Sequence, residues 1–172
     1  KSENRWLQFE KKPHTFCNAL PARMSRALAN IASMNNPGKS FVDPCCGMGT
    51  VLIQAADMGY EIQGFDINPI VSRDARENLA YFGFKPSVEC RDASLVSGSY
   101  AISVLDLPYG LLSKKGSDQY EEIVGNLRKL CTQAVILSGE DISGIINGAG
   151  FDIIQKCIVH KGGLDRHIAL CR

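Results

Sequence analysis

The segment Asp106-Leu107-Pro108-Tyr109-Gly110 carries groups that could hold a planar base with an exocyclic amine. Pro108 has no backbone donor and favours an extended Leu107, which leaves the Leu107 carbonyl oxygen free to accept a hydrogen bond. This carbonyl and the Asp106 carboxylate could take the two amine hydrogens, while Tyr109 stacks on the ring, a contact of about 1–3 kcal/mol per base. A turn with a half-buried tyrosine is the alternative interpretation.

A glycine loop, Asp43-Pro-Cys-Cys-Gly-Met-Gly-Thr50, joins a short apolar stretch to a nearly all-apolar one. Gly47 and Gly49 suit a turn in which a ligand approaches the backbone closely and φ is positive. A dinucleotide-binding loop would need a third glycine where Leu52 stands, so that pattern is incomplete. The loop indicates a ligand site, and a merely tight strand-to-helix turn is the alternative.

Asp66 ends the next apolar stretch, 17 residues after Gly49. Its carboxylate could accept hydrogen bonds from the two hydroxyls of a ribose, which fits NAD and S-adenosylmethionine equally. An aspartate here is also a common helix cap. Because Asn68 and Pro69 take the cap and first-turn positions, the pattern favours a ligand-binding Asp66.

Apolar stretches with strand and helix periods alternate along the chain, separated by Gly and Pro. The predicted strands are Ser40–Val42, Glu61–Phe65, Ser87–Cys90, Tyr100–Leu105 and Ala134–Leu137. The predicted helices are about Asn18–Ala32, Val51–Met58, Pro69–Phe82, Asp118–Leu130 and Asp141–Ala149, with Asp118 and Glu121 at capping-box spacing. Phe151–His160 and Leu164–Cys171 flank a Gly-Gly turn and predict an antiparallel hairpin.

Five strand-helix units and a closing hairpin predict an α/β fold with a Rossmann-like, doubly wound sheet of seven strands. The sheet is mostly parallel, with one antiparallel strand from the C-terminal hairpin. We expect one domain over 1–172, with an N-terminal helical segment to about 38 and the core sheet over 39–172. Ligands bind at the carboxyl ends of such strands, where Asp66, Asp92 and Asp106 fall.

Length, composition and charge limit the class of protein. The chain has 172 residues, 45% of them apolar. No apolar run approaches the ~18 residues of a membrane helix, so the composition predicts a soluble globular domain. A net charge of +1 excludes a protein that grips nucleic acid by charge alone. Seven cysteines, an odd number without zinc-site spacing, predict reduced, mostly buried thiols, no metal and a cytoplasmic location.

Taken together, the motifs resemble those of the class I S-adenosylmethionine-dependent methyltransferases, in the amino-methylating group with an (Asn/Asp)-Pro-Pro-(Tyr/Phe) motif. More narrowly, the chain resembles the catalytic domain of the THUMP-associated RNA methylases, which make N2-methylguanosine in tRNA or rRNA. Residues 13–20 resemble the upstream cofactor-carboxylate motif of this family. The glycine loop resembles its D-P-x-C-G-x-G-T motif, and residues 64–68 resemble its G-x-D-x-N motif.

The resemblance implies S-adenosyl-L-methionine as cofactor, with the glycine loop at the methionine part and Asp66 on the ribose. Ile67 would lie against the adenine, with Asp92 and Ala93 at its amine edge. The implied cofactor-binding residues are Phe16, Asn18, Asp43, Cys45, Gly47, Gly49, Thr50, Asp66, Ile67, Asp92 and Ala93.

The implied catalytic residues are Asp106, Leu107, Pro108 and Tyr109. Leu107 stands where the family usually has proline, and since that position acts through its carbonyl, we expect function to survive. Lys114 and Lys115 follow this motif and could meet RNA phosphates at the mouth of the site, although paired lysines are usually just solvated.

Three functional hypotheses follow. The first is a methyltransferase acting on the exocyclic amine of guanine in tRNA or rRNA. The second is an adenine-N6 or other amino-methyltransferase with DNA, RNA or another substrate. The third is a non-catalytic module that binds the cofactor and serves a partner. No THUMP-like segment is recognisable in these residues, so we expect any RNA-binding domain or partner subunit to lie outside this chain.

Overall fold

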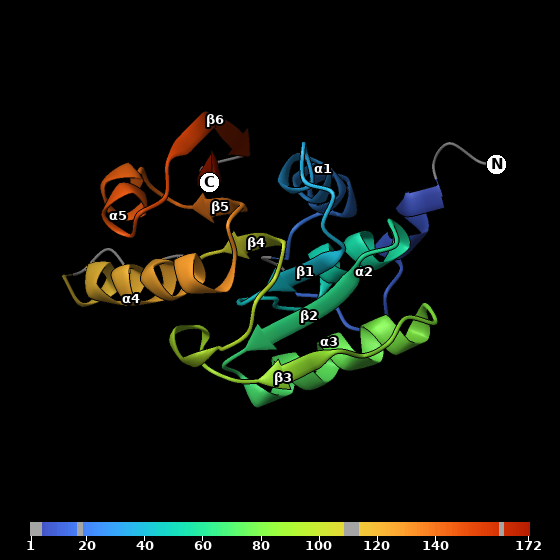
Figure 1. Ribbon diagram of the computed structural model, residues 1–172. Helices are drawn as coiled ribbons and strands as arrows, with labels where there is room; N and C mark the ends of the chain where they lie inside the picture. The colour runs from blue at the N-terminus through green and yellow to red at the C-terminus, as the bar shows by residue number, and fades with distance from the viewer. Residues whose placement is uncertain (1–4, 17–18, 109–113, 162–163) are drawn as a thin grey trace.

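The computed structural model describes residues 5–16, 19–108, 114–161 and 164–172, which form a sheet with helices on both faces (Figure 1). The strands are β1 (Ser40–Asp43), β2 (Glu61–Asp66), β3 (Val88–Cys90), β4 (Ile102–Asp106), β5 (Ala134–Ser138), β6 (Ile153–Lys161) and β7 (Leu164–Cys171). They form one seven-stranded sheet in the order β3-β2-β1-β4-β5-β7-β6.

The strand directions confirm the predicted sheet. β3, β2, β1, β4 and β5 pair in parallel. β7 runs antiparallel to both of its neighbours, β5 and β6, and is the one reversed strand. The chain first adds strands on one side of β1 and then crosses to β4 on the other, so the winding reverses between β1 and β4.

The helices are α1 (Ala22–Ala32), α2 (Thr50–Asp57), α3 (Pro69–Tyr81), α4 (Lys114–Leu130) and α5 (Ser143–Gly148), with short 3-10 helices η1 (Arg5–Glu10) and η2 (Ala93–Leu95). Asn68 caps α3 as predicted, because its side-chain oxygen accepts hydrogen bonds from the N–H groups of Ile70 and Val71 at 3.0 and 3.4 Å. In the part of the chain that the structure describes, no helix is long and apolar enough to cross a membrane.

Successive strand residues face opposite sides of the sheet and contribute to apolar cores on both sides. On one side, Val104 and Val135 pack with α1, α2 and α3. On the other side, Leu105 and Ile136 pack with α4 and α5. Figure 1 shows α4 and α5 together on one side and α1 to α3 on the other. This two-sided burial explains why the central strands are almost wholly apolar.

Two predicted helix starts are wrong. The first helix begins at Ala22, not near Asn18, because Pro21 is extended, with φ −62° and ψ 148°, and occupies the N-cap. The fourth helix begins at Lys114, so Asp118 lies inside α4 and caps nothing. Its spacing to Glu121 also fits two neighbours on one helix face, and both side chains are exposed.

Candidate active site

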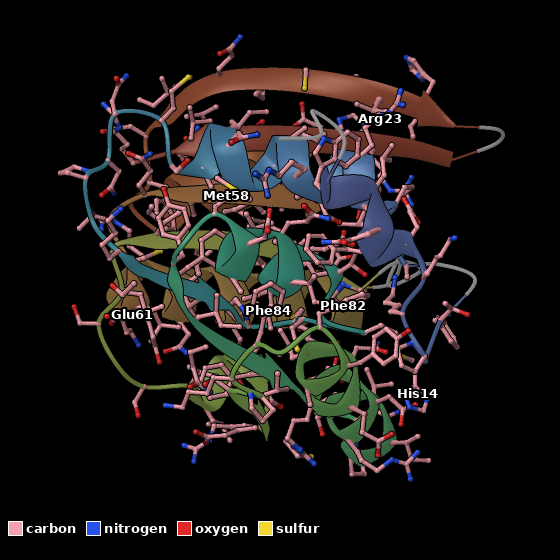
Figure 2. The ribbon with its side chains drawn as sticks, turned by 90° about the vertical axis from the view of Figure 1, so that its right-hand side faces the viewer. His14, Arg23, Met58, Glu61, Phe82 and Phe84 are labelled. Carbon is pink, nitrogen blue, oxygen red and sulfur yellow. The ribbon has the colours of Figure 1, made fainter. Side chains whose placement is uncertain are left out.

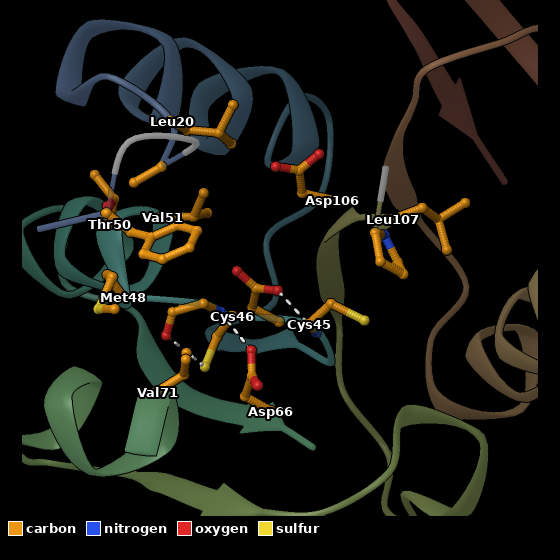
Figure 3. A pocket seen from close by; sticks show the side chains of 15 residues that line it. Leu20, Cys45, Cys46, Met48, Thr50, Val51, Asp66, Val71, Asp106 and Leu107 are labelled. Carbon is orange, nitrogen blue, oxygen red and sulfur yellow. Dashed lines mark hydrogen bonds between the residues drawn. The ribbon is translucent and has the colours of Figure 1, made fainter. Parts of the chain in front are cut away.

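Three aspartates end three adjacent strands at the point where the winding reverses. Asp43 ends β1, Asp66 ends β2 and Asp106 ends β4. Because parallel strands present their carboxyl ends on one edge of the sheet, these carboxylates surround one crevice. Figure 3 shows Asp66 and Asp106 on either side of the turn formed by Cys45 and Cys46.

The glycine loop leaves β1 and enters α2 through two left-handed residues. Gly47 has φ 52° and Gly49, the N-cap of α2, has φ 75°, which confirms the predicted need for glycine. A Cβ atom on Gly47 would meet no atom within 4 Å, so the backbone there faces open space. The Cys46 N–H donates to the Phe65 carbonyl at 2.8 Å and ties the loop to β2.

Asp66 holds this loop from the neighbouring strand. One carboxylate oxygen accepts a hydrogen bond from the Gly47 N–H at 3.0 Å, and the other accepts from the Asn68 N–H at 2.9 Å. The side chain is half-buried and lines the crevice. Asp66 therefore organises the loop backbone, and each oxygen keeps a second lone pair for a ligand.

Asp43 is the most deeply buried of the three carboxylates, with 2% of its surface exposed. It accepts a hydrogen bond of 3.2 Å from the Cys45 N–H. Burial raises the pKa of Asp43 well above its ordinary value, and the charges of Asp106 and Asp66 raise it further. The floor of the crevice is thus a site where an added positive charge is electrostatically favoured.

Two pockets of about 240 Å³ each occupy the crevice and share four lining residues, Cys45, Asp66, Asp106 and Pro108. The first pocket brings together these four with the predicted residues Phe16, Asp43, Gly47, Thr50 and Leu107. The second brings the same four together with the predicted residues Ile67, Asp92 and Ala93. Gly49 lines neither pocket and instead starts α2.

Some predicted residues cannot be placed in this way. Asn18 and Tyr109 lie outside the described residues. Lys114 and Lys115 form the start of α4, and their side chains are outside the described part as well.

The motif at the end of β4 is held from two sides. The Leu107 N–H donates to the Leu137 carbonyl of β5 at 3.0 Å, and the Leu107 side chain is 1% exposed in the core beneath α4. Figure 3 shows this side chain pointing away from the Asp106 carboxylate. The Pro108 carbonyl accepts a hydrogen bond of 2.6 Å from the Tyr120 hydroxyl of α4.

The second pocket has an acidic and an apolar wall. Asp92 accepts hydrogen bonds from the N–H and the hydroxyl of Ser94, at 2.9 and 2.8 Å, and so caps η2. Ala93 is buried, and its carbonyl accepts from the Asn126 amide at 2.9 Å. Ile67 is 65% exposed at the pocket rim. A flat ring could lie between such walls.

The surroundings of the paired cysteines of the loop disfavour their thiolate forms. Cys46 is buried and Cys45 half-buried. Burial raises the pKa of both thiols well above the ordinary value, and the neighbouring Asp43 charge adds to the rise. Of the six described cysteines, four are buried or half-buried, as predicted, whereas Cys90 and Cys157 are exposed.

Sequence reasoning missed two polar residues that hold the site. Asn78 of α3 bonds to the backbone at His14 and Met48, and Tyr120 bonds to Pro108. Neither residue belongs to a motif, and nothing in the local pattern distinguishes them from ordinary helix residues. It also missed apolar lining residues of the first pocket, namely Ala19, Leu20, Cys46, Met48, Val51 and Val71.

One group of side chains among the described residues has metal-ligand chemistry. Ligand atoms of His14, Asp74 and Glu77 lie within 4.8 Å of one another. Arg73 pairs with Asp74 at 2.7 Å and with Glu77 at 3.8 Å. The group lines neither pocket of the crevice, and ion pairing accounts for its arrangement.

Curated relatives of this chain methylate guanine in RNA, according to their names. Over 117 residues the chain is 29% identical to the tRNA (guanine(10)-N2)-dimethyltransferase of Methanothermobacter thermautotrophicus, covering 66% of this chain and 34% of that protein. Over 150 residues it is 29% identical to the U6 snRNA (guanine-N(2))-methyltransferase THUMPD2 of Bos taurus, covering 76% and 30%. The chain therefore spans about a third of the length of these relatives.

Solved methyltransferase structures share the fold. TrmN from Thermus thermophilus superposes with a TM-score of 0.73 at 21% identity, over 88% of this chain and 48% of that one. Magnesium protoporphyrin IX methyltransferase from Synechocystis superposes with a TM-score of 0.69 at 17% identity, over 88% of this chain and 79% of that one. At such identities the likeness establishes the fold and leaves the substrate open.

The family is established by the sequence itself. Residues 11–143 match the family model of the RMKL-like methyltransferase domain, a span that holds the upstream motif, the glycine loop and the Asp106 motif. This match confirms the resemblance that the motifs carried. The chain belongs to the family of RMKL-like methyltransferase domains.

Proposed function

We propose that this domain transfers a methyl group from S-adenosylmethionine to the exocyclic amine of guanine in an RNA. The observation that carries the proposal is the place of Asp106, which ends β4 at the reversal of the winding and lines both pockets of the crevice. An acceptor there can meet a substrate amine and a cofactor at once. The names of the curated relatives support guanine as the base.

The two pockets fit the proposed cofactor. Asp66, at their common wall, would bind the ribose, and the second pocket offers Asp92 and Ile67 for the adenine. The buried Asp43 and its two acidic neighbours favour a cationic group in the first pocket. When bound, S-adenosylmethionine supplies an activated methyl group on a positively charged sulfur.

The protein's part in the proposed reaction is to orient the amine. The lone pair of a guanine amine is delocalised into the ring, so the nitrogen must be held in line with the methyl group and turned toward a tetrahedral geometry. We assign this role to the Asp106 carboxylate and the Leu107 carbonyl, each accepting one amine hydrogen. Proximity of this kind lowers barriers by about 7–11 kcal/mol, and preorganised acceptors add a few more. Asp106 also stabilises the positive charge that develops on nitrogen.

The remaining parts of the proposed site are positioning and docking groups. Tyr109 would stack on the base, and Lys114 and Lys115 would meet RNA phosphates near the crevice. With a net charge of +1, the chain has little overall attraction for RNA. We therefore place the main RNA-docking surface on another domain or subunit. The cysteine usage supports a cytoplasmic location.

Mass spectrometry of nucleosides from tRNA, rRNA and DNA of cells with and without the gene tests this function. Loss of N2-methylguanosine from one RNA pool supports the proposal and identifies the substrate class. An unchanged guanosine profile with loss of a methyladenine contradicts the choice of guanine and favours adenine. The same analysis includes the small nuclear and other small RNA, because one relative is named for U6 snRNA. An unchanged profile in all of these pools contradicts nucleic-acid methylation.

A further inference from the structure

Asn78 of α3 is a fully buried amide whose hydrogen bonds all go to backbone groups of distant segments. Its side-chain oxygen accepts from the His14 N–H at 2.9 Å. Its side-chain nitrogen donates to the His14 carbonyl and to the Met48 carbonyl, both at 3.0 Å. One side chain thus joins two segments that are 64 and 30 residues away in sequence.

Both segments contribute to the lining of the first pocket. His14 leads into the stretch that contributes Phe16, Ala19 and Leu20 to the lining. Met48 lies between the two glycines of the loop and lines the pocket itself. Their separation is therefore fixed by three hydrogen bonds to a single residue outside the pocket lining.

Further contacts hold the upstream segment on the same side of the molecule. The His14 ring contacts Glu77 of α3, with 2.7 Å between Nε2 and the carboxylate oxygen, and Figure 2 shows His14 beside this helix. The Ala22 N–H donates to the Glu10 carboxylate at 2.7 Å and joins the two ends of the segment. Phe9 packs edge-on against Phe82 just beyond α3, with ring centroids 5.0 Å apart.

We propose that Asn78 is a positioning residue for the cofactor: it sets the width of the first pocket by clamping the His14 backbone to the glycine loop. The inference rests on the proposed function, since it assumes that this pocket binds S-adenosylmethionine. The clamp acts on binding of the cofactor and not on the amine at Asp106. Asn78 variants should therefore raise the cofactor Kd and the KM for the cofactor while leaving kcat at saturation nearly unchanged.

The chemistry of the side chain makes the proposal specific. An asparagine supplies one acceptor and two donors, and all three are used here. An aspartate of the same shape could still accept from the His14 N–H but could donate to neither carbonyl. Asn78→Asp is thus a near-isosteric change that removes two bonds and places a negative charge against two carbonyl oxygens.

Gln133 provides a matched control because it is a second buried amide with three bonds. Its nitrogen donates to the carbonyls of Ala32 and Met34 at 2.7 and 2.9 Å, and its oxygen accepts from Arg172 at 3.0 Å. It lines neither crevice pocket. Gln133→Glu also removes two donated bonds, but its carboxylate keeps Arg172 as an oppositely charged partner. It should therefore lower the melting temperature of the protein, by less than Asn78→Asp does, without changing cofactor binding.

The experiment is isothermal titration of the full-length protein with S-adenosylmethionine and S-adenosylhomocysteine, for wild type, Asn78→Asp, Asn78→Ala and Gln133→Glu. The Asn78 variants should bind about tenfold or more weakly, and Gln133→Glu within about twofold of wild type. Wild-type affinity in a folded Asn78→Asp protein, or an equal loss in Gln133→Glu, would overturn the clamp. If Asn78→Ala does not fold, Asn78→Asp alone decides.

Amide hydrogen exchange without any cofactor separates this inference from the proposed function. The clamp predicts faster exchange in Asn78→Asp both for residues 11–16 and for residues 46–50, and unchanged exchange there in Gln133→Glu. Exchange at the wild-type rate in both segments would overturn the clamp. A wild-type protein that binds no S-adenosylmethionine would contradict the proposed function, and the exchange rates would then decide on the clamp by themselves.

Discussion

The Tyr120 hydroxyl donates a hydrogen bond of 2.6 Å to the carbonyl oxygen of Pro108, so α4 holds the backbone of the Asp106 motif. Tyr120 is 3% exposed, and burial, together with the charges of Glu140 and Asp106, raises the pKa of its hydroxyl above the ordinary value. The hydroxyl therefore remains a donor throughout the neutral range. The Tyr120–Pro108 hydrogen bond thus links the core beneath α4 to the backbone next to Asp106.

Tyr120→Phe should lower turnover about tenfold and weaken cofactor binding much less, because it frees the Pro108 backbone next to Asp106 while the glycine loop and Asp66 stay in place. Folding stability should fall by about 1 kcal/mol. Steady-state kinetics and titration calorimetry measure the two effects. Tyr81→Phe, at an exposed position of α3, is the control and should change neither quantity. Wild-type kcat in Tyr120→Phe would show that the bond does not position the motif.

Leu107→Pro restores the residue that the family usually carries and should nevertheless destabilise this protein. Proline removes the N–H that bonds to the Leu137 carbonyl, and it empties part of a core site where Leu107 is 1% exposed. Together these losses should cost about 3 kcal/mol. Leu107→Met keeps the N–H and most of the volume, so its cost should stay below about 1.5 kcal/mol. Denaturant unfolding compares the two, and equal stability of Leu107→Pro and wild type would contradict this account.

Asp43→Asn should change how stability depends on pH. The folded state raises the pKa of Asp43, chiefly by burial, so the protonated form is favoured on folding. The contribution of protonated Asp43 to stability is complete below the pKa that Asp43 has in the unfolded chain. This contribution is lost as pH rises through the higher pKa that Asp43 has in the folded protein. Asparagine is neutral and can still accept from the Cys45 N–H.

The melting temperature of Asp43→Asn relative to wild type should therefore increase as pH rises from acid toward neutral and beyond. Scanning calorimetry across this range measures the difference, with Asp118→Asn at an exposed site of α4 as the control. If the melting temperature of wild type instead rose relative to that of Asp43→Asn with rising pH, the folded protein would stabilise the charged Asp43 carboxylate, which would contradict the raised pKa.

Thiol alkylation should distinguish the exposed cysteines from those of the crevice. Cys90 and Cys157 are exposed, whereas burial raises the pKa of the Cys45 and Cys46 thiols. A maleimide at neutral pH should label the exposed pair about tenfold faster or more, because the thiolate is the reactive form. Peptide mass spectrometry follows each site. Labelling of Cys45 as fast as Cys90 would indicate an activated thiol in the glycine loop.

Local patterns were sufficient for most of the fold. Each predicted strand is present, and the positive φ angles of Gly47 and Gly49 and the Asn68 cap are as the glycine loop and the Asn-Pro pair indicated. Such features depend on the chemistry of neighbouring residues. The start of α4 was wrong because a capping-box spacing at Asp118 and two neighbours on a helix face look alike in sequence.

The residues that hold the site together were not predictable in the same way. Asn78 lies in a helix, where asparagine usually meets solvent, and its partners are 64 and 30 residues away. In the sequence, Tyr120 looks like an ordinary apolar residue of α4. It holds the Asp106 motif only because the fold brings the Pro108 carbonyl within hydrogen-bond distance of its hydroxyl. Sequence motifs therefore indicate which groups face the ligand, while tertiary packing decides which buried polar groups hold them in place.

The most direct test of the proposed chemistry replaces the gene by an Asp106→Ala allele. We expect N2-methylguanosine to disappear from the substrate RNA as completely as in a deletion strain, because the acceptor that orients the amine is lost. The variant protein should accumulate normally and, when purified, still bind S-adenosylmethionine within about tenfold of wild type, because only one of the three crevice carboxylates is removed. A normal level of N2-methylguanosine, or a folded variant that no longer binds the cofactor, would contradict the role of Asp106.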